Sequence, residues 1–193
     1  TGVRMLWVRA HGESESYYWS DLISALEARG AEMVEDYAPI TAAAERWFDV
    51  PAGWVQLTNG LDEGLHVVAH AAARSRGGHV EAATRSRHTA NAVIVEPAFE
   101  MYAACADAAG LQAIHVTPEP DLAFPLERQL AAVGPDTRLI NLTDPNNPTG
   151  LGIPAGAVER IAGEASRAFV LVDEAYAEFS GRTCIGPLLD RHR

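Results

Sequence analysis

The sequence predicts an α/β protein in which a mostly parallel sheet lies between two layers of helices. From Trp54 onward, short apolar runs alternate with helical stretches, which is the pattern of strand–helix–strand units. The apolar runs are continuous, as in AFVLV at 168–172, and do not alternate with polar residues. Such strands are expected to be buried on both faces, which gives a three-layer α/β/α arrangement.

The expected elements follow in order along the chain. A first helix covers LISALEARG, because Ser20-Asp21 precede it, three apolar positions share one face and Gly30 ends it. Thr41 is expected to cap a second, short helix. Residues 1–49 are otherwise interpreted as an N-terminal arm and helical lead-in without a sheet of its own. The later elements are strands at 54–58, 92–96, 111–116, 138–143 and 168–173, and helices at 61–73, 99–109, 125–132 and 155–166.

Composition excludes several classes of function. The net charge of −11 argues against general nucleic-acid binding. No apolar run approaches the length of a membrane span, and the opening residues lack a signal-peptide pattern, so a cytoplasmic location is the default expectation. Cys105 and Cys184 are far apart and match no metal or redox spacing. Neither end of the sequence resembles a natural terminus, which favours a fragment of a longer protein.

Polar segments follow the predicted strands, where ligands bind in open α/β sheets. The first, NGLDEG at 59–64, offers a tight turn at Gly60 and then the free N–H groups of a helix N-terminus. Such an end suits a phosphate. An ordinary turn is the alternative, because Asp62 and Glu63 would also complement the helix dipole by themselves.

The second polar segment places aromatic residues after the strand at 92–96. Phe99 or Tyr102 could stack on a flat heteroaromatic ring at this strand–helix junction. The alternative, which the sequence alone favours, is that these rings pack the following helix onto the sheet.

The third and fourth segments carry an amide and a carboxylate. DPNNPTG at 144–150 contains two prolines and a glycine, which fix a rigid loop able to aim the side chain of Asn147. Asp173 ends a buried strand, and a buried carboxylate needs a partner. A protonated ring nitrogen of a cofactor would provide one, whereas the alternative is a helix N-cap.

Taken in order, these segments resemble the class I/II aminotransferases, which are fold type I pyridoxal-phosphate (PLP) enzymes, and most of all the histidinol-phosphate aminotransferases. The resemblance rests on NGLDE, EPAFEMY, PNNPTG and VDEAYAEF, the last at 172–179. It implies that residues 50–193 are a partial PLP-binding large domain, incomplete at the C-terminal end. It further implies transamination between an amino acid or amino-phosphate and a 2-oxo acid.

The resemblance also implies a role for each matching residue. Leu61 and Asp62 would present backbone N–H groups to the cofactor phosphate, and Phe99 would stack on the pyridine ring. Asn147 and the phenol of Tyr176 would contact the ring hydroxyl oxygen, and Asp173 would pair with the ring nitrogen. Tyr37, in EDYAPI, would reach the phosphate of a neighbouring subunit, which implies a homodimer with shared sites.

One departure from the family pattern concerns the catalytic group itself. All fifteen basic residues are Arg, so the chain lacks the Lys that holds the cofactor as a Schiff base. No residue is therefore assigned as catalytic, and the sequence is interpreted as a fragment that ends before that Lys. Two alternatives stay open: a non-catalytic relative that binds PLP, and a PLP-dependent decarboxylase of amino-acid phosphates.

Overall fold

The computed structural model describes residues 4–8, 38–75 and 90–185. The chain divides into two compact units, one formed by Thr1–Arg9 with Asn59–Arg193 and the other by Ala10–Thr58. In the second unit, α2 (Ala38–Trp47) begins before Thr41, the expected cap. The helix expected over LISALEARG lies outside the described residues. The division expected between residues 49 and 50 stays a prediction.

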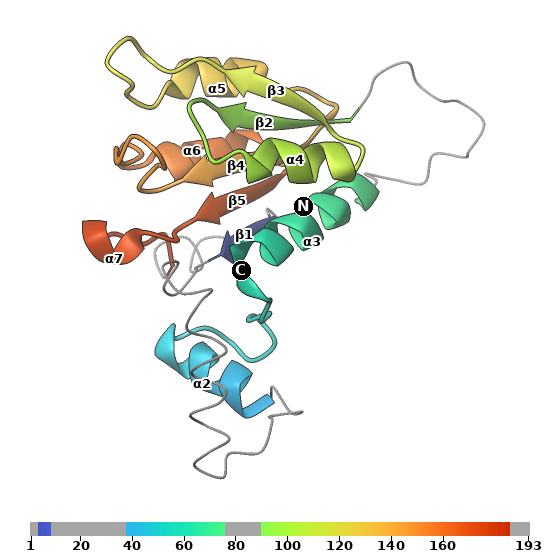
Figure 1. The fold of residues 1–193 in the computed structure, drawn as a ribbon, viewed down its shortest axis with the longest axis vertical. Coiled ribbons are helices and arrows are strands. Elements are labelled where there is room, and N and C mark those ends of the chain that lie inside the picture. The colour runs from blue at the N-terminus through green and yellow to red at the C-terminus, as the bar shows by residue number, and fades with distance from the viewer. Residues whose placement is uncertain (1–3, 9–37, 76–89, 186–193) are drawn as a thin grey trace, which may run out of the picture. The chain divides into compact units, whose positions relative to one another are not determined.

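The first unit is built on one parallel sheet of five strands. Its spatial order is β1 (Arg4–Val8), β5 (Phe169–Asp173), β4 (Thr137–Thr143), β2 (Asn91–Val95) and β3 (Gln112–Val116), and every neighbouring pair is parallel (Figure 1). The predicted α/β class with a parallel sheet is therefore confirmed. Four of the five expected strands form within two residues of the predicted bounds.

Two expectations about strands are wrong. Residues 54–58 form no strand, although the apolar run WVQLT predicted one. Conversely, residues 4–8 do form a strand and pair in parallel with β5, whereas the strands expected from the sequence begin at residue 54. A strand exists only where a neighbour completes its hydrogen bonds, and that neighbour cannot be read from the segment itself.

Helices cover both faces of the sheet. On one face, α3 (Gly60–Arg74) contacts β4 and α4 (Met101–Ala108), and α4 also contacts β2 and β3 (Figure 1). Buried residues of α3 recur at 61, 65, 68, 69 and 72, which is the spacing of one helical face. The other face carries α5 (Leu126–Ala132) and α6 (Ala157–Glu164), and a short helix, α7 (Ala177–Ser180), follows β5.

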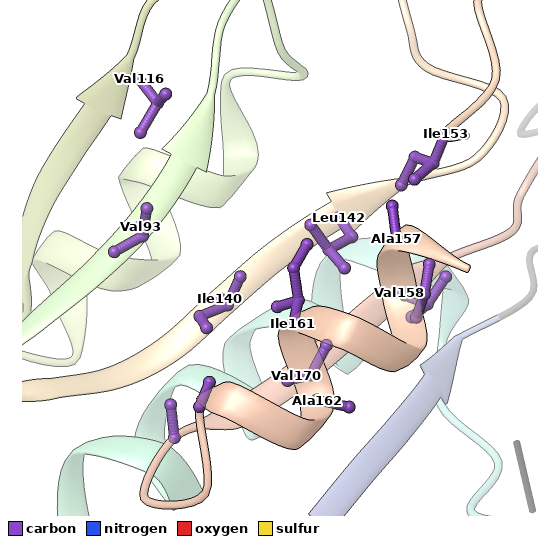
Figure 2. Close-up of a cluster of buried hydrophobic side chains, with 13 residues drawn as sticks. Val93, Val116, Ile140, Leu142, Ile153, Ala157, Val158, Ile161, Ala162 and Val170 are labelled. Atoms are coloured by element: carbon purple, nitrogen blue, oxygen red, sulfur yellow. The ribbon is translucent and has the colours of Figure 1, made fainter. Parts of the chain in front are cut away.

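A hydrophobic core lies between the sheet and α6. Val93, Ile140 and Val170 come from three neighbouring strands and are fully buried. Figure 2 shows them in one cluster with Ile161 and Ala162 of α6. Because alternate strand residues point to opposite faces, Ile94 and Asn141 must face the α3 and α4 side instead. This packing fixes the carboxyl ends of the strands relative to one another.

Strand order also marks where a ligand should bind. After β2 the chain moves to one side to form β3 and then crosses to the other side of β2 to form β4. The crevice at the carboxyl ends of β2 and β4 is therefore a topological switch point, where open α/β sheets bind ligands. Of the helices within the described residues, none is both long and apolar enough to cross a membrane.

Candidate functional site

The polar segments that follow β2, β4 and β5 meet at one edge of the sheet. Because these strands are parallel and adjacent, their carboxyl ends lie side by side. Thr143 at the end of β4 is level with Asp173 at the end of β5, and the backbone N–H of Asp144 donates to the Asp173 carbonyl at 2.9 Å. The structure thus brings Asp173 next to the loop that carries Asn147.

Asp173 is buried and is held by hydrogen bonds from Tyr102 and Ala175. Its side chain is 2% exposed. The phenol of Tyr102 donates to Oδ2 at 2.5 Å, and the backbone N–H of Ala175 donates to Oδ1 at 2.8 Å. Tyr102 in turn accepts a hydrogen bond from the Thr143 hydroxyl at 2.9 Å. These donors hold the Asp173 carboxylate in a fixed orientation. A helix N-cap, the alternative role, would not require the bond from Tyr102.

Tyr102 also links Asp173 to Phe99. The two rings of Phe99 and Tyr102 lie edge to face, with centroids 6.0 Å apart and planes at 90°. Tyr102 is 2% exposed, whereas Phe99 is half-buried, so one face of the site has an accessible aromatic ring backed by a buried one. The expectation that Tyr102 packs α4 onto the sheet is met, but its hydroxyl adds a polar contact that packing alone did not predict.

The loop at 144–153 is held by a dense set of hydrogen bonds around Asn146. The Asn146 side-chain amide donates to the Pro97 carbonyl at 3.1 Å and to the Thr149 hydroxyl at 2.9 Å. Its backbone N–H donates to the Leu151 carbonyl at 2.9 Å, and its carbonyl accepts from Gly150 at 2.7 Å. Asn147 is half-buried beside this anchor. A fixed backbone on both sides lets an amide side chain be aimed at a ligand.

A cavity of about 30 Å³ lies between the ends of β2 and β4. Tyr102, Thr143 and Asn146 line it, together with Asn141, whose buried Nδ2 has no hydrogen-bond partner in the described part of the chain. This volume suits a bound water and is too small for an aromatic ring. A ring-shaped ligand would therefore have to lie further out, above the strand ends.

The remaining expected residues are placed as follows. Tyr176 is half-buried in the turn that leads from β5 into α7, and its ring lies 6.2 Å from that of Phe179. Leu61 and Asp62 lie in the first turn of α3, where backbone N–H groups lack intrahelical partners. The Leu61 side chain is buried, so only its backbone could meet a ligand. Tyr37 lies outside the described residues.

Sequence reasoning missed three charged residues beside this site. Asp144 is 5% exposed and pairs with Arg182 at 3.0 Å, while Glu174 is 1% exposed and accepts from the Thr183 hydroxyl at 2.7 Å. Burial raises the pKa of Asp144 above its usual range, although Arg182 and the Ile153 N–H act against that rise and Glu174 adds to it. The sequence did contain a signal for these residues. Asp144 and Glu174 each follow an apolar strand, and a carboxylate buried at such a strand end needs a hydrogen-bond or charge partner.

Comparison with known proteins identifies the family. A family model described as "Aminotransferase class I and II" matches residues 40–190. The chain belongs to the class I and II aminotransferases. Histidinol-phosphate aminotransferase 2 of Ralstonia nicotianae is 36% identical over 141 residues, which are 72% of this chain and 34% of that protein. Histidinol-phosphate aminotransferase of Methanococcoides burtonii is 43% identical over 88 residues, 46% of this chain and 24% of its own length.

Solved structures agree on the fold of this aminotransferase chain. The histidinol-phosphate aminotransferase from Clostridium acetobutylicum superposes with a TM-score of 0.65 and 17% identity, covering 95% of this chain and 50% of that one. The L-threonine-O-3-phosphate decarboxylase from Porphyromonas gingivalis gives 0.66 and 14%, covering 98% and 52%. At these identities the likeness shows the fold alone. The chain spans about a third of the length of its first curated relative.

Aminotransferases of this family are PLP-dependent in general, and the donor set here fits that cofactor. A buried, hydrogen-bonded carboxylate suits the protonated pyridine nitrogen, and the half-buried ring of Phe99 suits stacking. The rigid loop offers the Asn147 amide, and the first turn of α3 offers N–H groups for a phosphate. The group that does not fit is the Schiff-base Lys, because the 193 residues contain none.

Proposed function

We propose that this chain supplies the PLP-binding part of an aminotransferase that transfers an amino group from histidinol phosphate to a 2-oxo acid. The observation that carries the proposal is the Asp173 carboxylate, buried at the end of β5 and held by Tyr102. Family membership makes PLP the expected cofactor, and the curated relatives bear the name histidinol-phosphate aminotransferase.

Each residue would then have a defined task toward the cofactor. PLP, when bound, supplies an electron sink for the carbon that loses its amino group. Asp173 would accept a hydrogen bond from the ring N–H and keep that nitrogen protonated. Asn147 and Tyr176 would donate to the ring hydroxyl oxygen, and Phe99 would cover one ring face. The N–H groups of Leu61 and Asp62 would bind the phosphate.

Covalent attachment and proton transfer need a Lys that these 193 residues do not contain. We therefore assign turnover to a longer protein, of which this chain would be the cofactor-binding part, and we assign no catalytic residue to the chain itself. The homodimer with Tyr37 reaching a neighbouring site, and the cytoplasmic location, belong to the same proposal. They rest on the family resemblance.

PLP binding by the 193-residue chain tests the cofactor assignment directly. Equilibrium dialysis with PLP should show saturable binding that Asp173→Asn and Asn147→Ala each weaken about tenfold or more, because each removes a contact to the ring. Asp107→Asn is the matched control, since Asp107 is exposed on α4 away from the strand ends. Equal binding by the wild type and Asp173→Asn would contradict the proposed ring-nitrogen contact.

Activity requires the complete reading frame of the source gene. That protein, purified with PLP, should transfer the amino group of histidinol phosphate to a 2-oxo acid. Release of CO₂ from an amino-acid phosphate, without transfer, would favour the decarboxylase alternative. A reading frame that ends without a Lys, together with PLP binding and no turnover, would favour the non-catalytic relative.

A further inference from the structure

The segment at 181–185, which we call the strap, holds the Asn147 loop through Arg182. One guanidinium nitrogen, Nη2, donates to Asp144 Oδ2 at 3.0 Å and to the carbonyl oxygen of Ile153. Asp144 opens the loop at 144–153, and Ile153 ends it. A single side chain therefore holds together the two ends of the loop that carries Asn147.

Gly152 provides the space that this contact needs. A Cβ atom at Gly152 would lie 2.2 Å from Arg182 Nη1 and 3.1 Å from Asp144 Oδ1. The backbone of Gly152 is not in the left-handed region, so its conformation does not by itself require glycine. Asp144 Oδ1 also accepts from the Ile153 N–H at 3.2 Å. The residue types at 144, 152 and 182 thus fit one another.

Glu174 anchors the other part of the strap to the end of β5. Its carboxylate accepts from the Thr183 hydroxyl at 2.7 Å and from the backbone N–H of Cys184. Glu174 directly follows Asp173, the expected partner of the ring nitrogen. The strap therefore connects the Asn147 loop with the Asp173 strand end through charged hydrogen bonds, which are stronger than neutral ones.

We propose that Arg182 is a positioning residue of the cofactor site, which holds the Asn147 loop at a fixed distance from Asp173. The proposal rests on the proposed function, because it assumes that Asn147 and Asp173 contact one ligand. Binding groups must be held within about 0.5 Å of their productive positions, and a loop achieves this only with bracing from residues around it. The Asn146 contacts brace the loop on the β2 side, and Arg182 braces it on the β5 side.

Loss of the Arg182 guanidinium should loosen the loop before any ligand is added. In hydrogen exchange on the 193-residue chain, Arg182→Met should raise the exchange rates of the Asn146 and Gly150 amides, whose hydrogen bonds lie within the loop. Arg138→Met is the matched control. Arg138 lies at the other end of β4, where its guanidinium donates to the carbonyl oxygens of Pro135 and Thr137. Unchanged exchange at Asn146 and Gly150 would overturn the bracing role.

PLP affinity separates a positioning role from a general loss of stability. Arg182→Met should raise the Kd for PLP about tenfold, whereas Arg138→Met should leave it unchanged. The double variant Asp144→Asn/Arg182→Met no longer buries an unpaired carboxylate, so its thermal stability should recover while its PLP affinity stays weak.

The outcomes distinguish this inference from the proposed function. The inference would be overturned if Arg182→Met bound PLP with wild-type affinity. It would also be overturned if PLP affinity recovered together with stability in the double variant. Neither result would contradict the proposed PLP site. An absence of PLP binding in the wild-type chain would instead overturn the cofactor assignment, and with it the role of Arg182 toward that cofactor.

Discussion

Removal of one oxygen atom, in Tyr102→Phe, should destabilise the sheet end measurably. Phenylalanine keeps the buried ring and its edge contact with Phe99, but Asp173 Oδ2 loses the donor that lies 2.5 Å away. That short distance is typical of an O–H group bonded to a carboxylate. Because Tyr102 and Asp173 are each 2% exposed, water cannot readily replace the lost donor.

The magnitude follows from the kind of bond that is lost. A hydrogen bond to a charged group contributes about 1.5–3 kcal/mol, so we expect a loss of about 2 kcal/mol in the free energy of unfolding. For a chain of this size, that corresponds to a fall in Tm of about 4–8 °C. Thr143→Val, which removes a neutral bond to the same phenol, should cost about 1 kcal/mol or less.

Urea unfolding of the 193-residue chain, followed by circular dichroism, measures these differences. A double-mutant cycle that combines Tyr102→Phe with Asp173→Asn isolates the energy of the pair, which should exceed the coupling between Tyr102 and Thr143. A cost for Tyr102→Phe within about 0.5 kcal/mol of zero would refute the reasoning, because that is the range of an ordinary surface substitution.

Three further predictions concern stability and reactivity. Because burial raises the folded-state pKa of Asp144 above its unfolded value of about 3.9, its contribution to stability is present below that pH and is lost as pH rises through the raised pKa. The free energy of unfolding of the wild type, relative to Asp144→Asn, should therefore fall across that window in urea titrations at successive pH values, and a flat difference would contradict the shift. Burial, and then the nearby Glu174, raises the pKa of Cys184 to about 12, so iodoacetamide at pH 8 should label it about a thousandfold more slowly in the native chain than in urea, as read by peptide mass. Rapid native labelling would show that the thiol is not in this environment. Ile161→Ala should cost about 3 kcal/mol, because this fully buried α6 side chain fills the main core, and a loss below about 1 kcal/mol in urea unfolding would contradict the packing.

The sheet was predictable from sequence because its central strands are continuous apolar runs. AFVLV is apolar on both faces, and AVIVE and RLINLT are mostly apolar, so burial on both sides was the natural interpretation. The strand at 4–8 and the missing strand at 54–58 were not predictable in this way. Both segments contain apolar residues, and only the presence of β5 beside residues 4–8 decides between them.

Site residues that follow a strand were predictable from the sequence. Site residues whose role depends on a hydrogen bond to a distant residue were less predictable. Asp173 and the loop at 144–150 could be found because they end strands, and their roles toward PLP stay predictions. The hydrogen bonds of Tyr102 and Arg182 could not be found in this way. Their partners, Asp173 and Asp144, lie 71 and 38 residues away, and such pairing arises only from the folded chain.

The position of β1 affects where the chain can be truncated without loss of the folded unit. The family match begins at residue 40, yet β1 lies before that point and pairs along the full length of β5. Every residue of β5 is buried. A truncated chain that starts at residue 40 would leave the N–H and C=O groups on one side of β5 without their partners, and would present an apolar strand as an edge. The boundary of sequence similarity is therefore a poor guide to the boundary of the folded unit, and shortened versions should retain residues 4–8.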